Sequence, residues 1–428
     1  MSPNPTESKP AAAPPAGRFA LLVIFLTVFI DLLGFGIVIP LLPIYSEKFG
    51  ATPMELGLVF SCFSGMQFLF APMWGRISDR IGRKPVLVGC LFGSAAAYAL
   101  FSQVDGMMLL VISRLLAGFF GANISTAVAY IADVTTPANR AKGMGMIGMA
   151  FGLGFTVGPL FGGELNNIST HLPGFVAAGL SFTAALVGWK FLIEQPRAAR
   201  SQSRVFGMTD VRRAFSDARI GTVLILSFLA IFAFASFESM FVVFGLAQFP
   251  TYFGLDSPVA NATVAQINAA GAYSGRYLFA VGLLSALIQG GLIRRLVPRF
   301  GETRLIIAGP LILALGLFVI ALANSWWLVI VGCVVMPMGF GLNNPSLTSL
   351  VSRASPEAEQ GAFLGINQSL LSLARVLGPM CAGIAFQKRS PQTPFAIAAA
   401  VLVVAGLIAR WYHARYGASF AVATQTTA

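Results

Sequence analysis

The stretch FALLVIFLTVFIDLLGFGIVIPLLPI, residues 19–44, decides the fold class of this chain. It carries a single charged residue, Asp31, in 26 positions. A helix needs about 20 apolar residues to cross the hydrocarbon core of a bilayer, and a spanning segment must satisfy its own backbone hydrogen bonds. Residues 19–44 therefore predict a transmembrane helix.

Similar apolar stretches recur along the whole chain. They lie near residues 19–44, 55–78, 84–104, 106–131, 141–164, 172–193, 220–245, 274–297, 303–323, 325–350, 359–384 and 392–412. A transmembrane β-barrel would instead show alternating stretches of about 10 residues, which the sequence lacks. The sequence thus predicts an all-α membrane protein with twelve transmembrane helices.

The composition agrees with this fold class. Of the 428 residues, 56% are hydrophobic and 10% are charged, whereas soluble domains carry about 25% charged residues. The net charge of +12 is typical of nucleic-acid-binding proteins, but the basic residues fall in short groups between apolar stretches, so we expect no nucleic-acid partner. The four cysteines lack metal-ligand spacing, and we expect neither a metal nor a cofactor.

The positions of Lys and Arg predict the orientation, because basic residues concentrate on the cytoplasmic side of a membrane. If the N-terminus is cytoplasmic, all but six of the 28 basic residues lie in cytoplasmic segments, which leaves 22. The six exceptions are Arg114 and Arg375 inside spans, and Lys48, Arg276, Lys388 and Arg389 on the outer side. Both termini are therefore predicted to be cytoplasmic.

The two halves of the chain repeat each other. Gly158-Pro159 matches Gly378-Pro379 at a shift of 220 residues, and Arg80-Ile81-Gly82 matches Arg299-Phe300-Gly301 at a shift of 219. In the first span of each half the shift is 203, and we assign the difference to a long outer loop at about 246–273. The predicted organisation is a disordered tail (1–18), a six-helix bundle (19–193), a cytoplasmic linker (194–219), a second six-helix bundle (220–412) and a C-terminal tail (413–428).

Three motifs in the N-terminal half resemble those of a known family. The stretch from Gly75 to Pro85, GRISDRIGRKP, closely resembles the inter-helix loop motif of the major facilitator superfamily. Arg114, followed by Gly118 and Gly121, resembles its fourth-span motif. The fifth span resembles the antiporter motif of its drug:proton exporters, through Gly152, Gly154, Gly158, Pro159, Gly162 and Gly163. The tetracycline-efflux group is the most similar in motifs.

The resemblance implies a pair of pseudo-symmetric six-helix bundles that work by alternating access. It implies proton-coupled efflux of small lipophilic or amphiphilic compounds by a monomer in the bacterial inner membrane, without enzymatic activity or an ATPase subunit. The pattern of the tetracycline group is broken by Ala97, Ser285 and Leu313, which stand where that group has polar residues. The expectation therefore does not extend to tetracycline itself.

Charged residues inside spans are expensive in hydrocarbon and are candidate functional residues. Asp31 precedes Gly34 and Gly36, and an apolar surrounding favours the protonated carboxyl group that proton exchange requires. Glu238 lies one helical turn beyond the repeat counterpart of Asp31 and is the second candidate. Arg114 is the third candidate for proton coupling. The alternatives are structural ion pairing for Asp31 and Arg114, and a solvated position for Glu238; we expect Arg375 to be mainly structural.

Polar side chains in otherwise apolar spans are candidates for a substrate cavity. They are Gln67, Asn123, Thr126, Gln289, Asn343 and Asn367. Each residue type also ties transmembrane helices together by hydrogen bonds, which is its commoner role.

The loop motif predicts a cytoplasmic gate made of acidic and basic groups. Its members are Gly75, Asp79, Arg80, Gly82, Arg83 and Asp133, and Asp133 is expected to reach the basic group. Gly154, Gly158 and Gly162 share one helix face and are expected to pack against a helix of the other half. Pro159 removes a backbone donor and permits bending there.

Other functions remain open at this point. A facilitator or symporter of a sugar or another small metabolite would share the fold. A pump driven by ATP is disfavoured because the chain has no phosphate-binding loop. A non-transporting receptor would give the intramembrane carboxylate no evident purpose.

Overall fold

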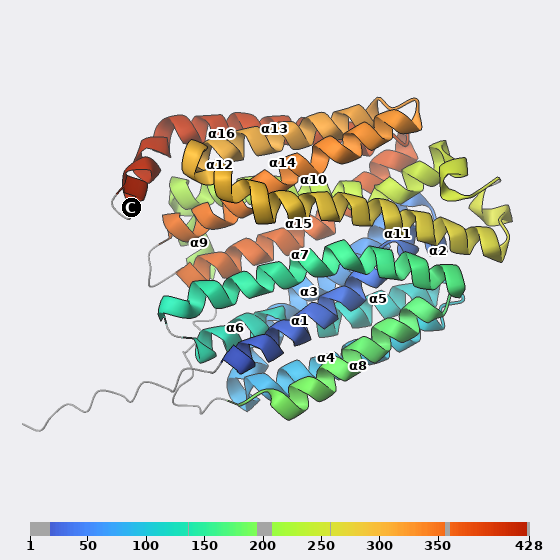
Figure 1. The fold of residues 1–428 in the computed structure, drawn as a ribbon, viewed down its shortest axis with the longest axis horizontal. Coiled ribbons are helices and arrows are strands. Elements are labelled where there is room, and N and C mark those ends of the chain that lie inside the picture. The colour runs from blue at the N-terminus through green and yellow to red at the C-terminus, as the bar shows by residue number, and fades with distance from the viewer. Residues whose placement is uncertain (1–17, 136, 195–207, 257, 356–359, 426–428) are drawn as a thin grey trace, which may run out of the picture.

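The computed structural model describes residues 18–135, 137–194, 208–256, 258–355 and 360–425. All regular elements in these residues are helical (Figure 1). The helices of the first half are α1 (Arg18–Val38), α2 (Leu41–Lys48), α3 (Pro53–Ile81), α4 (Arg83–Ser102), α5 (Met107–Gly121), α6 (Ile124–Val134), α7 (Pro137–Ile168) and α8 (Leu172–Phe191). Next come α9 (Met208–Ser216), α10 (Ala218–Gln248), the 3₁₀-helices η2 (Pro250–Phe253) and η3 (Val259–Asn261), α11 (Val264–Leu287), the π-helix η4 (Ile288–Leu292), α12 (Ile293–Phe300), α13 (Glu302–Ala321), α14 (Trp326–Ala354), α15 (Gln360–Lys388) and α16 (Thr393–Gln425).

Twelve of these helical stretches are long and apolar enough to cross a membrane, as the sequence predicted. Three of the spans are interrupted helices: α1 with α2, α5 with α6, and α11 with η4 and α12. The first interruption lies at Pro40, whose missing backbone N–H breaks the hydrogen-bond ladder. The second lies at Ala122 and Asn123, so the polar Asn123 sits at a helix break inside the bundle.

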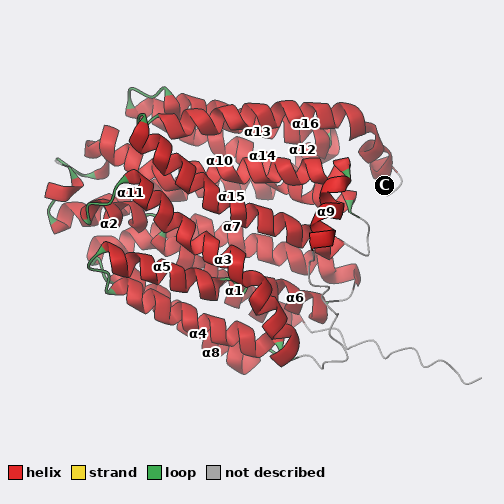
Figure 2. Ribbon diagram, turned by 180° about the vertical axis from the view of Figure 1, so that it is seen from behind, coloured by secondary structure: helices red, strands yellow, loops and turns green. Residues whose placement is uncertain are grey.

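Two groups of helices pack mainly within themselves. The first group contains α1 and α3 to α8, with α1 packed on α7 and α8 and α4 packed on α8. The second group contains α10 to α16, with α13 packed on α14 and α16 and α10 packed on α15. The groups lie one above the other in Figure 1, and the strongest contacts between them join α3 to α15 and α7 to α11. Figure 2 shows the same two layers from behind.

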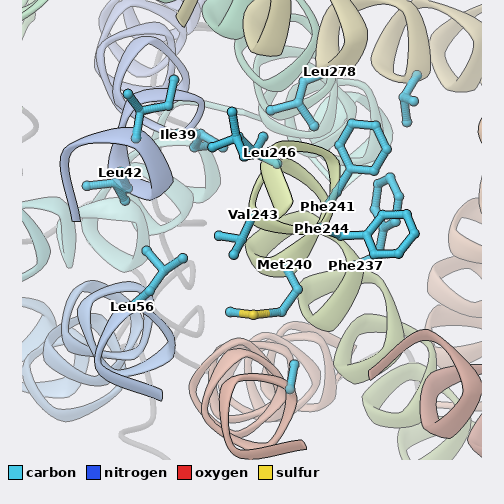
Figure 3. Packing of buried hydrophobic residues seen from close by; sticks show 14 of the residues in the cluster. Ile39, Leu42, Leu56, Phe237, Met240, Phe241, Val243, Phe244, Leu246 and Leu278 are labelled. Atoms are coloured by element: carbon cyan, nitrogen blue, oxygen red, sulfur yellow. The ribbon is translucent and has the colours of Figure 1, made fainter. Parts of the chain in front are cut away.

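The start of α1 and the end of α16 lie at the same end of the molecule, at the left in Figure 1. We call this end the terminal face and the opposite end, which carries α2 and η2, the distal face. The largest cluster of buried apolar residues joins the halves towards the distal face. Ile39, Leu42 and Leu56 from the first half pack there with side chains of α10 and α11 from the second (Figure 3).

The eighth span begins earlier than the sequence predicted. It runs from Val264 to Phe300 instead of 274–297, so the outer loop predicted at about 246–273 is shorter and Arg276 lies well within the span. The prediction failed because polar residues such as Gln266 and Asn268 lower the local hydropathy. The helix nevertheless starts directly after Thr263, because the Thr263 hydroxyl and the Gln266 side chain cap each other's backbone N–H groups.

Three predicted segments also differ at their ends. The linker contains the short helix α9, and α10 begins at Ala218. α16 continues to Gln425, through most of the segment predicted as a C-terminal tail. The predicted disordered tail lies outside the described residues except for its last residue, which starts α1.

Candidate functional site

A small cavity between the two halves gathers three of the four intramembrane charges. Its volume is about 20 Å³, which is room for about one water molecule. Arg114 reaches it from α5, Glu238 from α10 and Arg375 from α15. The other lining residues are Phe35, Leu42, Phe60, Phe63, Ser64, Phe155, Ala235 and Pro379. Charged groups from both halves therefore face one cavity, whose lining is otherwise largely aromatic.

Arg114 is fully buried, and its guanidinium group is poorly satisfied. Its Nη1 and Nη2 atoms have no hydrogen-bond partner among the described residues, and its Nε donates only a long bond of 3.4 Å to the Ser113 hydroxyl. The guanidinium carbon lies 4.7 Å from the centre of the Phe101 ring and 5.9 Å from that of Tyr98. Cation–π contacts of this kind compensate only part of the cost of burying a charge.

Glu238 and Arg375 interact across the second half. Each is the charged group that most affects the other's electrostatic environment. Within the described residues the pair forms no ion pair shorter than 4 Å. Arg375, which the sequence suggested to be mainly structural, thus lies at the same cavity as Glu238 and Arg114.

Asp31 lies apart from this cavity, in a buried polar region of the first half. Its side chain is buried beside Ser94 and Asn123, and its Oδ1 atom has no hydrogen-bond partner among the residues described. Asn123 reaches this position because the fourth span breaks there. Asp31 is not among the residues that line the cavity with Glu238, so the structure does not bring the two candidate carboxylates together.

Tyr98 connects the two polar regions, and sequence reasoning missed it. The charges of Asp31 and Arg114 both interact electrostatically with Tyr98, which is 2% exposed. A Cβ atom at Gly34 would lie 3.1 Å from this ring, so the glycine leaves room for Tyr98 beside α1. An aromatic residue in an apolar span carries no signal in the sequence that separates it from ordinary core residues.

The remaining polar candidates are distributed over both halves and do not line the cavity. Gln67 donates a hydrogen bond of 3.1 Å to the carbonyl of Gly121, which ties α3 to α5. Thr126, Asn343 and Asn367 are buried, and each has a side-chain oxygen without a partner in the described part of the chain. Gln289 lies in the π-helix η4, partly exposed.

The predicted gate residues form a compact cluster at the terminal face. Arg83 is 1% exposed and contacts Asp79, while its Nε lies 3.2 Å from the Asp133 Oδ2. Its Nη1 also donates to the Ser78 hydroxyl at 2.6 Å. Asp133 therefore meets the basic group through Arg83, and the cluster joins α3, α4 and α6 within one half. Arg80 is exposed, and the carbonyl of Gly75 accepts a bond from Ser78.

Glu194 caps α4 and was not singled out from the sequence. Its carboxylate accepts hydrogen bonds from the backbone N–H groups of Arg83 at 3.1 Å and Lys84 at 2.9 Å. Gly82 has a φ of 120°, and a Cβ atom there would lie 2.8 Å from this carboxylate. The sequence offered no signal because Glu194 follows the sixth span, far along the chain from the helix that it caps.

The second half carries a counterpart of the cluster around Arg83 and Asp133, with the acidic and basic groups exchanged. Glu302 begins α13 as Arg83 begins α4, and 302 − 83 gives the repeat shift of 219. The Glu302 carboxylate accepts hydrogen bonds from Ser349 and, at 2.7 Å, from Arg353 of α14. The acidic group thus stands on α13 and the basic group on α14, which reverses the arrangement of Arg83 and Asp133.

The glycine face of α7 packs within its own half, contrary to the prediction. Cβ atoms at Gly154, Gly158 and Gly162 would collide with Leu32, Gly36 and Ile37 of α1, respectively. Gly163 faces the other half, where a Cβ atom would lie 2.6 Å from the carbonyl oxygen of Gly271. Helical spacing predicts which residues share a face but not which neighbour that face meets. Pro159 lies inside the continuous helix α7, and its carbonyl faces Gly275.

An ion pair joins the two halves beside this contact. Arg276 of α11 binds Glu164 of α7 through two hydrogen bonds, of 2.6 and 3.2 Å. The side chains are 50% and 43% exposed, so solvent weakens the pair. It lies near the distal end of α7 and in the middle of α11.

We expect the charge reversals Glu164→Arg and Arg276→Glu to open the distal contact when made singly, and the double reversal to restore it. The expected change is about fivefold, because an exposed pair contributes up to about 1 kcal/mol. The readout is the rate at which a membrane-impermeant maleimide modifies Asn268→Cys in a chain whose native cysteines are replaced. A double variant as reactive as the single ones would contradict the expectation.

No group of three or more His, Cys, Asp or Glu side chains able to hold a metal ion occurs in the described residues. The site is instead built from single buried charges in apolar surroundings, which is the arrangement of an ion or solute pathway through a membrane.

Comparisons with known proteins agree with this architecture. The family model of the Major Facilitator Superfamily matches residues 24–297 and 260–421. The chain is 32% identical to the class C tetracycline resistance protein of Escherichia coli, over 84% of this chain and 88% of the relative. It is 30% identical to multidrug resistance protein 1 of Bacillus subtilis, over 86% of this chain and 90% of the relative. The crystal structure of the human organic anion transporter MFSD10 (TETRAN) superposes with a TM-score of 0.69 and 26% identity, covering 93% of this chain and all of that one. With twelve spans, a cavity between two helical groups and matches over most of its length, the chain belongs to the major facilitator superfamily and is a multi-pass membrane transporter, not an enzyme.

Proposed function

We propose that this transporter exports small lipophilic or amphiphilic compounds from a bacterial cytoplasm in exchange for protons. Both termini would lie in the cytoplasm, and a monomer would suffice for transport. The names of the relatives span tetracycline resistance, multidrug resistance and organic anion transport. The proposed substrates are therefore defined by their physical character and not as one compound.

The proposed proton exchange rests on Asp31. It is a carboxylate in the middle of an apolar span, 8% exposed, with one oxygen unpaired in the described residues. A buried carboxylate of this kind is expensive while ionised, so it is suited to take up a proton from one side of the membrane and release it to the other.

The distribution of tight contacts supports alternating access. Gly57 lies against Pro379, Gly383 against Pro53 and Gly163 against Gly271, all towards the distal face. Nearer the terminal face, a Cβ atom at Gly145 or Gly148 of α7, or at Gly290 or Gly291 of η4, would meet nothing within 4 Å. With cytoplasmic termini, this state would be closed to the outside.

The test replaces Asp31 with asparagine in reconstituted vesicles that carry a proton gradient. Three probes cover the charge classes: 2-naphthoate, 2-naphthamide and tetraphenylphosphonium. We expect the wild-type chain to couple proton flux to the movement of at least one probe, and Asp31→Asn to reduce that flux to the level of protein-free vesicles. The physical reason is that the asparagine amide neither binds nor releases a proton at the pH values on either side of the membrane.

Asp105→Asn is the matched control, because Asp105 is an exposed aspartate in the loop between α4 and α5. Proton flux that persists undiminished in Asp31→Asn would remove the coupling role of this residue. The direction of flow separates export by exchange from the alternative of a symporter: protons and probe move in opposite directions in the first case and together in the second.

A further inference from the structure

The cavity between the halves holds more positive than negative charge. Arg114 and Arg375 contribute two guanidinium groups, and Glu238 is the single carboxylate among the described lining residues. No described acidic side chain lies within 4 Å of either arginine. The described lining of this cavity therefore carries one positive charge more than its single carboxylate balances.

We infer that this cavity binds the anionic group of an amphiphilic substrate through Arg114 of one half and Arg375 of the other. The inference rests on the proposed function and deepens it, because it names a substrate class: lipophilic carboxylates and sulfonates.

Arg114 provides the main physical argument. It is 0% exposed, and two of its three guanidinium nitrogens lack partners within the described structure. Burying an arginine without a countercharge costs several kcal/mol, which a bound anion would relieve. The two free nitrogens form the planar fork that binds both oxygens of a carboxylate.

Arg375 differs from Arg114 in having a nearby countercharge. Glu238 reduces the positive field of Arg375, although the two are more than 4 Å apart. Glu238 should consequently compete with a substrate anion for Arg375. Because Arg114 and Arg375 belong to different halves, an anion held by both would bridge the halves.

The walls of the cavity indicate what else the substrate must contain. The rings of Phe35 and Phe63 stack with their centres 4.2 Å apart, and Phe35 lies 5.3 Å from Phe155. These rings favour an aromatic or aliphatic body next to the anionic group. Since the cavity holds about one water molecule in this state, the ligand enters when the two halves move apart.

The experiment measures binding to the purified full-length chain in lipid nanodiscs by calorimetry. The probes are 2-naphthoate and its neutral isostere 2-naphthamide, with tetraphenylphosphonium as the lipophilic cation. We expect the wild-type chain to prefer 2-naphthoate over 2-naphthamide by about 10- to 100-fold, the range for hydrogen bonds to charged groups. Arg114→Gln and Arg375→Gln should each lose most of that preference. Arg294→Gln, which removes an exposed arginine of α12, is the control.

Glu238→Gln gives a readout of opposite sign. Removing this carboxylate frees Arg375, so 2-naphthoate should bind more tightly than to the wild-type chain, while 2-naphthamide binding stays the same. General damage to the fold would weaken both. Should an Arg→Gln variant fail to fold, the corresponding Arg→Lys variant keeps the charge but loses the fork, and we expect it to retain only part of the preference.

Equal binding of 2-naphthoate and 2-naphthamide by the wild-type chain would overturn the inference, as would a preference that survives both Arg→Gln substitutions. A preference for tetraphenylphosphonium would overturn it as well.

These outcomes concern binding alone. If the chain binds 2-naphthoate as expected but moves no probe with protons, the proposed function fails and the binding site stands. If it exchanges tetraphenylphosphonium for protons but does not favour 2-naphthoate, the binding site fails and the proposed function stands.

Discussion

Gly275→Val is expected to separate the two halves at the distal face and to reduce transport severely. A Cβ atom at this position would overlap the carbonyl oxygen of Pro159 and lie 3.0 Å from the Gly163 Cα. Both are backbone atoms, so no side chain can rotate away and the helices α7 and α11 must move. Overpacking of this kind costs about 1–3 kcal/mol or more, and 1–3 kcal/mol shifts a two-state equilibrium by about 5- to 150-fold.

Spin labels at Ile168 and Val264 report this separation directly. These residues lie at the distal ends of α7 and α11 and are 74% and 62% exposed, so labels there should not disturb the packing. Pulsed electron paramagnetic resonance, in a chain without native cysteines, should show a longer distance in Gly275→Val. Gly89→Val is the matched control, because a Cβ atom at Gly89 meets nothing within 4 Å. An unchanged distance distribution would show that this contact does not determine the closed state.

Arg83→Ala is expected to destabilise the folded chain by about 3–5 kcal/mol, the range for removing one partner of a buried ion pair. Arg83 and the Asp133 side chain are each 1% exposed. The substitution removes the guanidinium group that joins Asp79, Asp133 and Ser78, and so it loosens α3, α4 and α6 at once. The measurement is the denaturation of the purified protein in detergent, followed by intrinsic fluorescence.

Arg76→Ala serves as the control, since Arg76 belongs to the same loop motif and is exposed. A change of about 0.5 kcal/mol or less is expected there. Arg83→Lys should recover only part of the stability, because an ammonium group does not reproduce the several directed bonds of the guanidinium. Equal stability of Arg83→Ala and the wild-type chain would mean that the cluster is not part of the folded core.

The twelve spans followed from the sequence because hydropathy is a local property. A run such as residues 19–44 must leave water wherever its neighbours lie, so each span could be recognised alone. Spacing within one helix was equally accessible: Gly154, Gly158 and Gly162 do share a face. The start of the eighth span was missed because a capping motif at Thr263 extends the helix beyond its apolar part.

The neighbours of each helix required the tertiary structure. Leu, Phe and Ala serve equally well against lipid and against another helix, so an apolar sequence does not record which helix a face meets. For this reason the glycine face of α7 was assigned to the wrong half, and Tyr98 and Glu194 were overlooked. What the sequence determined is a twelve-helix membrane protein with four buried charges. Only the packing decided that Arg114, Glu238 and Arg375, which lie far apart in the chain, face one cavity, and that Asp31 does not line it.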